Sequence, residues 1–295
     1  MNRRTFLTAA AAAAVLPAAT ALPATVIDAH AHFYDPSRPQ GVPWPPKSET
    51  LLYRTVLPDE FVRLTKPLGV TGVIKVEASA WLEDNQWVLD LAAKNPVIVA
   101  SVGRLEPGVP GFRKDLARFH KNRLFRGIRL GKMQEGEEFI SDLKEMEEAG
   151  LELDAIGPPE LLAELVRLTD RVPGLRVVID HLPFDPPQEV GARKQYHAAL
   201  LELGRRPQVY AKVSNVVRRV RGRVPSEPAF DKSGLDELWD IFGQDRMIYG
   251  SNWPVSDKVA PYSTILQVVH QYFNAKGQEA SEKYFWKNSK AAYRW

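Results

Sequence analysis

The chain of 295 residues contains no cysteine. This absence excludes a disulfide framework, a thiolate nucleophile and a metal site built on thiolates. It does not identify the compartment, because exported and cytosolic proteins can both lack cysteine.

The chain also lacks a marked excess of charge of either sign. Lysine and arginine total 39, and aspartate and glutamate total 36. The balance falls to 37 against 36 once Arg3 and Arg4 are assigned to a leader. A nearly neutral chain gives no reason to expect nucleic acid or an anionic membrane as a partner. The expected partner is a small-molecule substrate, and the oligomeric state is left open.

The apolar run near the N-terminus is too short to cross a bilayer. It extends from Thr8 to Leu16, after the paired arginines of Asn2–Leu7 and before the small-x-small motif Ala19-Thr20-Ala21. This order is typical of a secretory leader, and the paired arginines are typical of the twin-arginine type. We therefore predict a signal peptide over residues 1–24, export to the periplasm or beyond, and no stable membrane insertion after its removal.

From Val26 onward, short apolar runs alternate with segments of helical period. The predicted strands are Val26–Phe33, Val70–Ser79, Val97–Glu106, Arg126–Leu130, Leu151–Ile156, Arg176–Leu182, Val209–Asn215 and Arg246–Tyr249. The predicted helices include Asp84–Lys94, Phe112–Asn122, Glu137–Glu148, Pro159–Arg171, Gln188–Arg205 and Tyr262–Asn274. Eight strands alternating with helices predict a single α/β domain, a (β/α)8 TIM barrel, over residues 25–295.

Two further features bear on this fold. A doubly wound open sheet is the alternative, but it usually carries a glycine-rich turn after its first strand, and no such turn follows Phe33. The final segment Ser281–Trp295 is rich in aromatic residues and predicts an extra helix that covers the barrel.

The first predicted strand concentrates polar side chains. Asp28, His30 and His32 stand at every second position of an otherwise apolar run. In a strand such residues point to one side, and burying them costs free energy unless each finds a partner. This pattern favours a site. The alternative is two surface histidines on a loop, with Asp28 as a cap.

Other strands also end in polar residues, as a barrel with its site at the carboxyl ends of the strands requires. These residues are Glu77, Arg129, Asp180, His181, Lys212, Ser214, Ser251 and Asn252.

Five motifs together resemble the amidohydrolase superfamily, especially its branch of sugar-acid lactonases and pyrone dicarboxylate lactonases. They are Asp28-Ala29-His30-Ala31-His32, Val76-Glu77-Ala78, Ile179-Asp180-His181, Ala211-Lys212-Val213-Ser214 and Tyr249-Gly250-Ser251-Asn252-Trp253-Pro254-Val255. The resemblance implies a distorted barrel that hydrolyses a lactone or a related carbonyl compound. It also implies that His30 and His32 bind metal and that His181 contacts metal or substrate.

Two positions depart from the superfamily pattern. Arg129 stands where a carbamylated lysine would bridge two metals, and a permanently cationic guanidinium cannot ligate a cation. This argues against a binuclear site and leaves one divalent metal, with zinc favoured, or none. Asn252 stands where most members carry an aspartate that is both ligand and general base, and an amide cannot accept a proton.

The residues suggest the following chemistry. Zinc held by His30 and His32 would activate water, with His181 as general acid or base. Glu77 either takes part as ligand, base or substrate contact, or pairs with Arg129 or Lys75.

Four residues are candidates for substrate binding. Lys212 and Arg129 end barrel strands, and Trp44 and Arg38 lie in the proline-rich loop after the first strand. Trp44 could stack on a sugar ring, although a rigid loop rim explains it equally well. For Lys212 the alternative is a buried ion pair, perhaps with Glu77.

Two functional alternatives stay open at this point. The first is a non-oxidative decarboxylase of the same superfamily. The second is a non-catalytic carbohydrate-binding barrel that has lost its base at Asn252.

Overall fold

The structure, a computed structural model, describes residues 21–217 and 232–295. Most of the predicted signal peptide lies outside the described residues, so it stays a prediction. Among the helices of the described ranges, none combines the length and the apolar character needed to cross a membrane.

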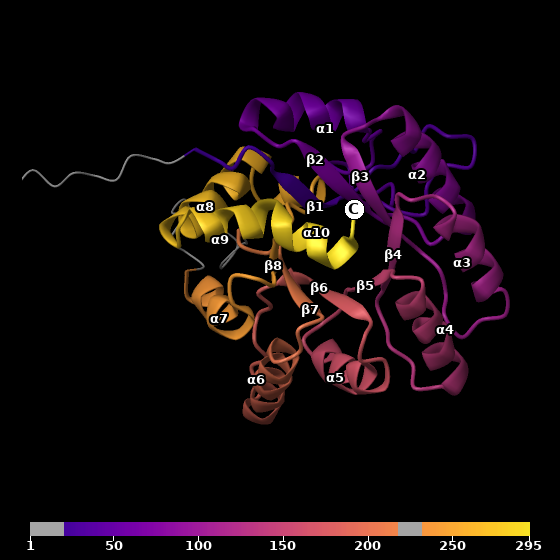
Figure 1. The fold of residues 1–295 in the computed structure, drawn as a ribbon. Coiled ribbons are helices and arrows are strands. Elements are labelled where there is room, and N and C mark those ends of the chain that lie inside the picture. The colour runs from indigo at the N-terminus through magenta and orange to yellow at the C-terminus, as the bar shows by residue number, and fades with distance from the viewer. Residues whose placement is uncertain (1–20, 218–231) are drawn as a thin grey trace, which may run out of the picture.

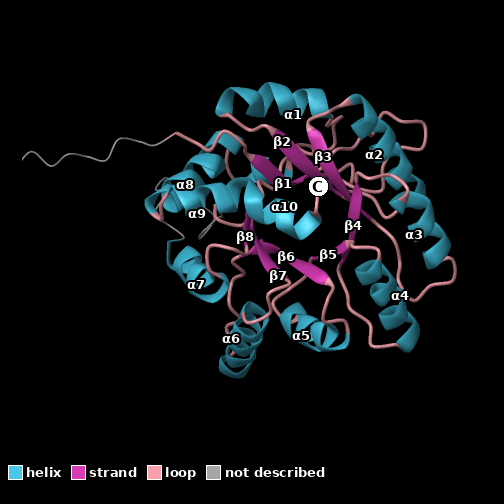
Figure 2. Cartoon of the chain, viewed as in Figure 1, coloured by secondary structure: helices cyan, strands magenta, loops and turns pink. Residues whose placement is uncertain are grey.

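Eight parallel strands form one sheet in sequential order, surrounded by helices (Figures 1 and 2). The strands are β1 (Ile27–Ala31), β2 (Gly72–Val76), β3 (Ile98–Gly103), β4 (Phe125–Leu130), β5 (Glu152–Ala155), β6 (Arg176–Leu182), β7 (Val209–Val213) and β8 (Met247–Tyr249). The sheet closes beyond β8, where the Asn252 amide donates to the His30 carbonyl at 2.8 Å and the His32 amide donates to the Trp253 carbonyl at 2.9 Å. The predicted (β/α)8 barrel is confirmed.

The outer layer consists of helices that follow the strands. They are α1 (Pro58–Thr65), α2 (Leu82–Lys94), α3 (Phe112–His120), α4 (Glu137–Glu148), α5 (Leu161–Arg171), α6 (Val190–Gly204), α7 (Lys232–Phe242) and α8 (Tyr262–Ala275), with short helical turns η1 (Lys66–Leu68) and η3 (Val255–Lys258). Two of them, α1 and α7, are not among the helices named in the sequence analysis. Helix α1 starts at Pro58 and carries Asp59 and Glu60 in its first turn, where a proline and negative charge both favour a helix start.

Apolar side chains pack in two layers because successive residues of a strand face opposite sides. An inner cluster fills the barrel, and a larger outer cluster joins the strands to the helices. From β1, Ile27 and Ala29 belong to the inner cluster, whereas Ala31 belongs to the outer one.

The C-terminal segment closes the amino-terminal end of the barrel. It is built from α9 (Gln278–Glu282), the π-helical turn η4 (Lys283–Lys287) and α10 (Asn288–Tyr293). Tyr293 packs into the inner cluster, and Arg176 at the start of β6 donates through Nε to the Ala292 carbonyl at 2.6 Å. Figure 1 shows the chain end over the centre of the strands. The predicted cover is present, but three short pieces replace the single helix predicted over Ser281–Trp295.

Candidate active site

A pocket of about 470 Å³ opens at the carboxyl ends of the strands. It is lined by His32, Pro43, Trp44, Glu77, Ala78, Ser79, Ala80, Arg129, Ile156, His181, Asn252 and Val255. Strand ends from β2, β4 and β6, together with the loops after β1 and β8, therefore bring six of the predicted site residues to one mouth. We call this pocket the barrel mouth.

Three histidines gather at the floor of the barrel mouth. The ring centroid of His30 lies 4.9 Å from that of His32 and 4.5 Å from that of His181. His32 Nδ1 lies 3.1 Å from the Val76 carbonyl, and His181 Nδ1 lies 2.8 Å from Ser214 Oγ. Each of these contacts fixes one ring nitrogen and leaves the other available for different partners.

Burial keeps these imidazoles neutral. Loss of hydration holds the pKa of His30 and of His32 well below the ordinary value. The same cause lowers the pKa of His181 to about 4, against the attraction of Asp180. Neutral imidazole is the form that binds a metal or accepts a proton.

Asp180 lies beneath the histidines, although strand alternation predicts that it points away from His181. That prediction is wrong because His181 has a φ of 62°, which ends the regular alternation of β6. Asp180 Oδ1 lies 3.5 Å from His30 Nδ1 and 2.8 Å from Lys212 Nζ. Its carboxylate therefore faces the candidate site.

Potential metal ligands come close together at this point. One ligand atom from each of His30, Asp180 and His181 lies within 4.8 Å of the others, and His32 is not part of that group. His30 Nδ1 is buried without a hydrogen-bond partner among the described residues. Its 3.5 Å separation from Asp180 Oδ1 matches the spacing of about 3.4 Å between two ligands of a tetrahedral zinc ion. The donor set fits one small divalent cation.

Arg129 occupies the other side of the histidines. Its Nε donates to Glu77 Oε1 at 2.9 Å and its Nη2 donates to the Glu77 carbonyl at 2.7 Å. Its Nη1 lies 3.5 Å from His30 Nε2 and 3.8 Å from Asp180 Oδ2. The guanidinium is permanently cationic and cannot itself ligate a metal, and the prediction against a binuclear site stays a prediction.

Asp28 has surroundings that differ from those predicted for it. Asp28 accepts from Ser251 Oγ at 2.5 Å and from Tyr262 Oη at 3.0 Å, so it faces α8 rather than the barrel mouth. A register shift between Asp28 and Ala31 interrupts the period-two pattern, and the prediction that Asp28 shares a face with His30 is wrong.

Arg38 and Lys212 are held in ion pairs away from the pocket lining. Arg38 donates through Nη1 to Asp84 Oδ1 at 2.9 Å and lies over the Trp87 ring at 4.4 Å. Lys212 is fully buried between Asp154 and Asp180, which bears out a buried ion pair but not one with Glu77. For both, the geometry favours a structural role over the predicted substrate contact.

Sequence reasoning missed the part played by Asp154. It lies on β5 two residues after Glu152, and both carboxylates are buried. Two acidic residues at alternate positions of a short buried strand signal a buried partner, and Lys212 is the cation that the structure provides. No signal in the sequence identifies Tyr293, whose hydroxyl donates to Asp154 Oδ1 at 2.7 Å.

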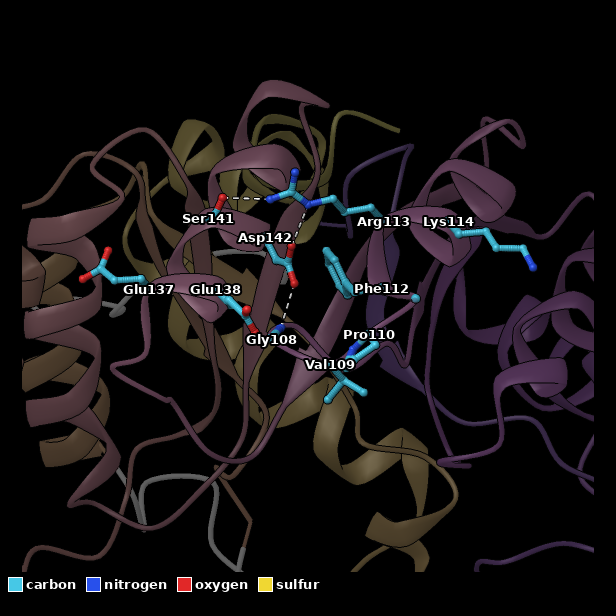
Figure 3. A pocket seen from close by; sticks show the side chains of 11 residues that line it. Gly108, Val109, Pro110, Phe112, Arg113, Lys114, Glu137, Glu138, Ser141 and Asp142 are labelled. Carbon is cyan, nitrogen blue, oxygen red and sulfur yellow. Dashed lines mark hydrogen bonds and ion pairs between the residues drawn. The ribbon is translucent and has the colours of Figure 1, made fainter.

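A second and larger depression, of about 670 Å³, lies between α3 and α4 (Figure 3). It is lined by Gly108, Val109, Pro110, Gly111, Phe112, Arg113, Lys114, Glu137, Glu138, Ser141 and Asp142. We call it the α3–α4 depression. It contains none of the predicted site residues.

Comparisons with known proteins show the family and agree with the fold. The amidohydrolase family matches residues 27–295. An L-fucono-1,5-lactonase from Burkholderia ambifaria is 31% identical over 237 residues, which cover 78% of this chain and 80% of that protein. An L-fucono-1,5-lactonase from Burkholderia multivorans is 26% identical over 277 residues, 88% of this chain and 92% of that protein. A crystal structure of an amidohydrolase from Burkholderia multivorans with bound zinc has a TM-score of 0.81 at 23% identity, covering 92% of this chain and 99% of that one.

Proposed function

The chain belongs to the amidohydrolase family, and from that membership and its barrel mouth we propose that it opens the lactone ring of a sugar acid with water. The observation that carries this proposal is the cluster of neutral His30 and His181 with Asp180 at the floor of a pocket. The lactonase relatives support a 1,5-lactone as substrate.

We further propose that His30 and Asp180 bind one divalent metal ion, with zinc favoured, and that His181, the third member of this group, stays off the ion and acts as the base. The spacing of His30 Nδ1 and Asp180 Oδ1 supports a shared ion, and so does the zinc in the solved amidohydrolase from Burkholderia multivorans. Such an ion would supply Lewis acidity, which favours deprotonation of water at neutral pH. His32 lies next to this group and lines the pocket.

His181 is the side chain best placed to move the proton. Its Nδ1 is fixed by Ser214, and its low pKa keeps the imidazole neutral at pH 7. It accepts the proton of the water that attacks the lactone carbonyl carbon. When the ring C–O bond breaks, the same imidazole returns that proton to the leaving alkoxide.

Arg129 and Trp44 orient the substrate. The Arg129 guanidinium lines the pocket and offers N–H donors to the carbonyl oxygen as negative charge develops on it. Trp44 lies 5.7 Å from the His32 ring between centroids, so its face forms a wall on which a sugar ring can rest.

A panel of sugar-acid lactones that includes L-fucono-1,5-lactone tests the proposal. We expect proton release well above the uncatalysed rate, loss of this activity after chelator treatment, and recovery with zinc. Metal analysis of the purified protein gives the stoichiometry, for which we expect one ion per chain. No acceleration by metal-loaded protein would contradict the proposal, and carbon dioxide release from carboxylated compounds would favour a decarboxylase.

Asn252 distinguishes an active enzyme from a non-catalytic barrel. It lines the barrel mouth with a φ of 59°, and its backbone amide binds the His30 carbonyl. We expect Asn252→Asp to decrease an existing lactonase activity, because the new carboxylate competes for Arg129 and His30. A large gain from a wild type that is nearly inactive would instead favour a binding barrel that has lost its base.

We also propose export by the twin-arginine route. The paired Arg3-Arg4 and the apolar run after them support it. Fractionation of cells that express the full chain tests this. Replacement of Arg3 and Arg4 by lysine should retain the protein in the cytoplasm, and unchanged export would contradict the route.

A further inference from the structure

A continuous chain of polar side chains runs through the barrel from its amino-terminal end to the barrel mouth. Tyr293 Oη donates to Asp154 Oδ1 at 2.7 Å, and Lys212 Nζ donates to Asp154 Oδ2 at 2.5 Å. Lys212 Nζ lies 2.8 Å from Asp180 Oδ1, and this oxygen lies 3.5 Å from His30 Nδ1. All five side chains are fully buried. We call this series the buried polar chain.

Lys212 is the centre of the buried polar chain. Burial acts to lower the pKa of its ammonium, but Asp154 and Asp180 together raise it, so the group stays charged. A buried cation between two carboxylates has its position set by both of them. The ring of Tyr293 also lies 5.4 Å from Lys212 Nζ, which adds a contact from the C-terminal helix.

Asp154 accepts from Tyr293 on Oδ1 and from Lys212 on Oδ2, and the buried carboxyl of Glu152 on the same strand also interacts with it. Without the Tyr293 hydroxyl, Oδ1 loses the short hydrogen bond that ties Asp154 to the C-terminal helix. A carboxylate with an unmet acceptor rotates or shifts towards other donors, and its remaining donor, Lys212, moves with it. Any such movement changes the distance from Lys212 to Asp180.

We propose that Tyr293 and Asp154 are positioning residues for the active site, which fix Lys212 so that Lys212 holds Asp180 opposite His30. The C-terminal helix thereby orients a group at the far end of the barrel, in addition to closing the near end. The effect on catalysis rests on the proposed function, but the orientation of His30 can be measured without any activity.

Tyr293→Phe tests the proposal by removal of one hydroxyl. Tyr284→Phe is the matched control, because Tyr284 is also buried in the C-terminal segment and donates to the Val213 carbonyl at 3.3 Å, outside the buried polar chain. The primary measurement is the side-chain ¹⁵N NMR spectrum of the six histidines in the metal-free protein, with His30 assigned from a His30→Gln variant. We expect the His30 resonances to move in Tyr293→Phe and to stay in place in Tyr284→Phe.

Zinc affinity gives a second measurement, by competition with a chelator. Loss of an outer partner of a metal ligand typically lowers affinity by about 10–100-fold, and we expect about tenfold for Tyr293→Phe because two residues separate it from Asp180. For lactone hydrolysis we expect kcat to fall while KM stays near the wild-type value, because the substrate does not contact Tyr293.

Three outcomes would overturn the proposal. His30 resonances in Tyr293→Phe that coincide with those of the wild type would show that the chain does not transmit position. Equal shifts in both tyrosine variants would show a general packing effect. Asp154→Asn provides a second variant should Tyr293→Phe not fold, and an unchanged His30 spectrum in that variant would overturn the proposal as well. A wild type without lactonase activity would contradict the proposed function alone, since the NMR comparison is made without substrate.

Discussion

The barrel mouth and the α3–α4 depression differ in how their polar groups are satisfied. In the larger α3–α4 depression, Asp142 accepts from the Gly108 amide at 2.7 Å and from Arg113 Nε at 3.0 Å, and Arg113 Nη2 donates to Ser141 at 2.8 Å (Figure 3). In the smaller barrel mouth, His30 Nδ1 is buried without a hydrogen bond among the described residues. The smaller region is therefore the one in which burial shifts the pKa of clustered histidines and leaves a ring nitrogen open to a ligand.

The two regions also differ in which residues have a positive φ. Positive φ in the α3–α4 depression occurs at Gly108 and Gly111, where it carries no steric cost. In the barrel mouth it occurs at His181 and Asn252, which are not glycines. Strained conformations of larger residues persist where a fixed side-chain direction is needed, and here they aim two residues into the pocket.

The largest expected effect comes from His181. We expect His181→Gln to lower kcat/KM for lactone hydrolysis by about 10²–10⁴-fold, because a glutamine can neither accept nor return the proton. Ser141→Ala in the α3–α4 depression is the matched control and should leave kcat/KM unchanged. A His181→Gln enzyme that keeps more than a tenth of the wild-type value would remove His181 from the mechanism and weaken the contrast between the regions.

The same variant should change how stability depends on pH. The folded-state pKa of His181 is about 4, below its ordinary value of 6.5, so between these values the unfolded chain binds more protons. Stability from this group is thus lost as the pH falls from about 6.5 to about 4, and the shift corresponds to about 3 kcal/mol at most.

Denaturant unfolding of metal-free protein at several pH values measures this loss. Asp154 acts in the opposite direction in part of this window, because burial raises its pKa to about 6. The histidine contribution is therefore the difference between wild type and His181→Gln, which should shrink as the pH falls. Parallel curves for the two proteins would contradict the low pKa of His181.

The sequence predicted the barrel well because the apolar runs and helix periods are local signals. β6 has the predicted bounds Arg176–Leu182, and α4 has the predicted bounds Glu137–Glu148. The final segment was harder, because the π-helical turn η4 divides what its aromatic spacing predicts as one helix. Helix α1 was missed, and at eight residues it offers only two turns of pattern.

The candidate site was predictable as far as regular strand geometry holds. His181, Asn252, Glu77 and Arg129 reach the barrel mouth because strand ends meet there in any such barrel. The orientations of Asp28 and Asp180 were not predictable, because a bulge in β1 and the positive φ of His181 reverse the expected faces. Partners brought together from distant elements, such as Lys212 with Asp154, depend on closure of the whole barrel.

The smallest expected effect lies in the α3–α4 depression. Arg113 is largely exposed and its partner Asp142 also binds the Gly108 amide, so Arg113→Gln leaves that carboxylate with a donor. We expect kcat/KM to stay at the wild-type value and the melting temperature to fall slightly, since exposed ion pairs contribute little to stability. Steady-state kinetics and thermal unfolding measure both. A marked fall in kcat/KM with an unchanged melting temperature would mean that this depression takes part in the reaction. A region whose polar groups are hydrogen-bonded could then be functional, and the contrast with the barrel mouth would fail.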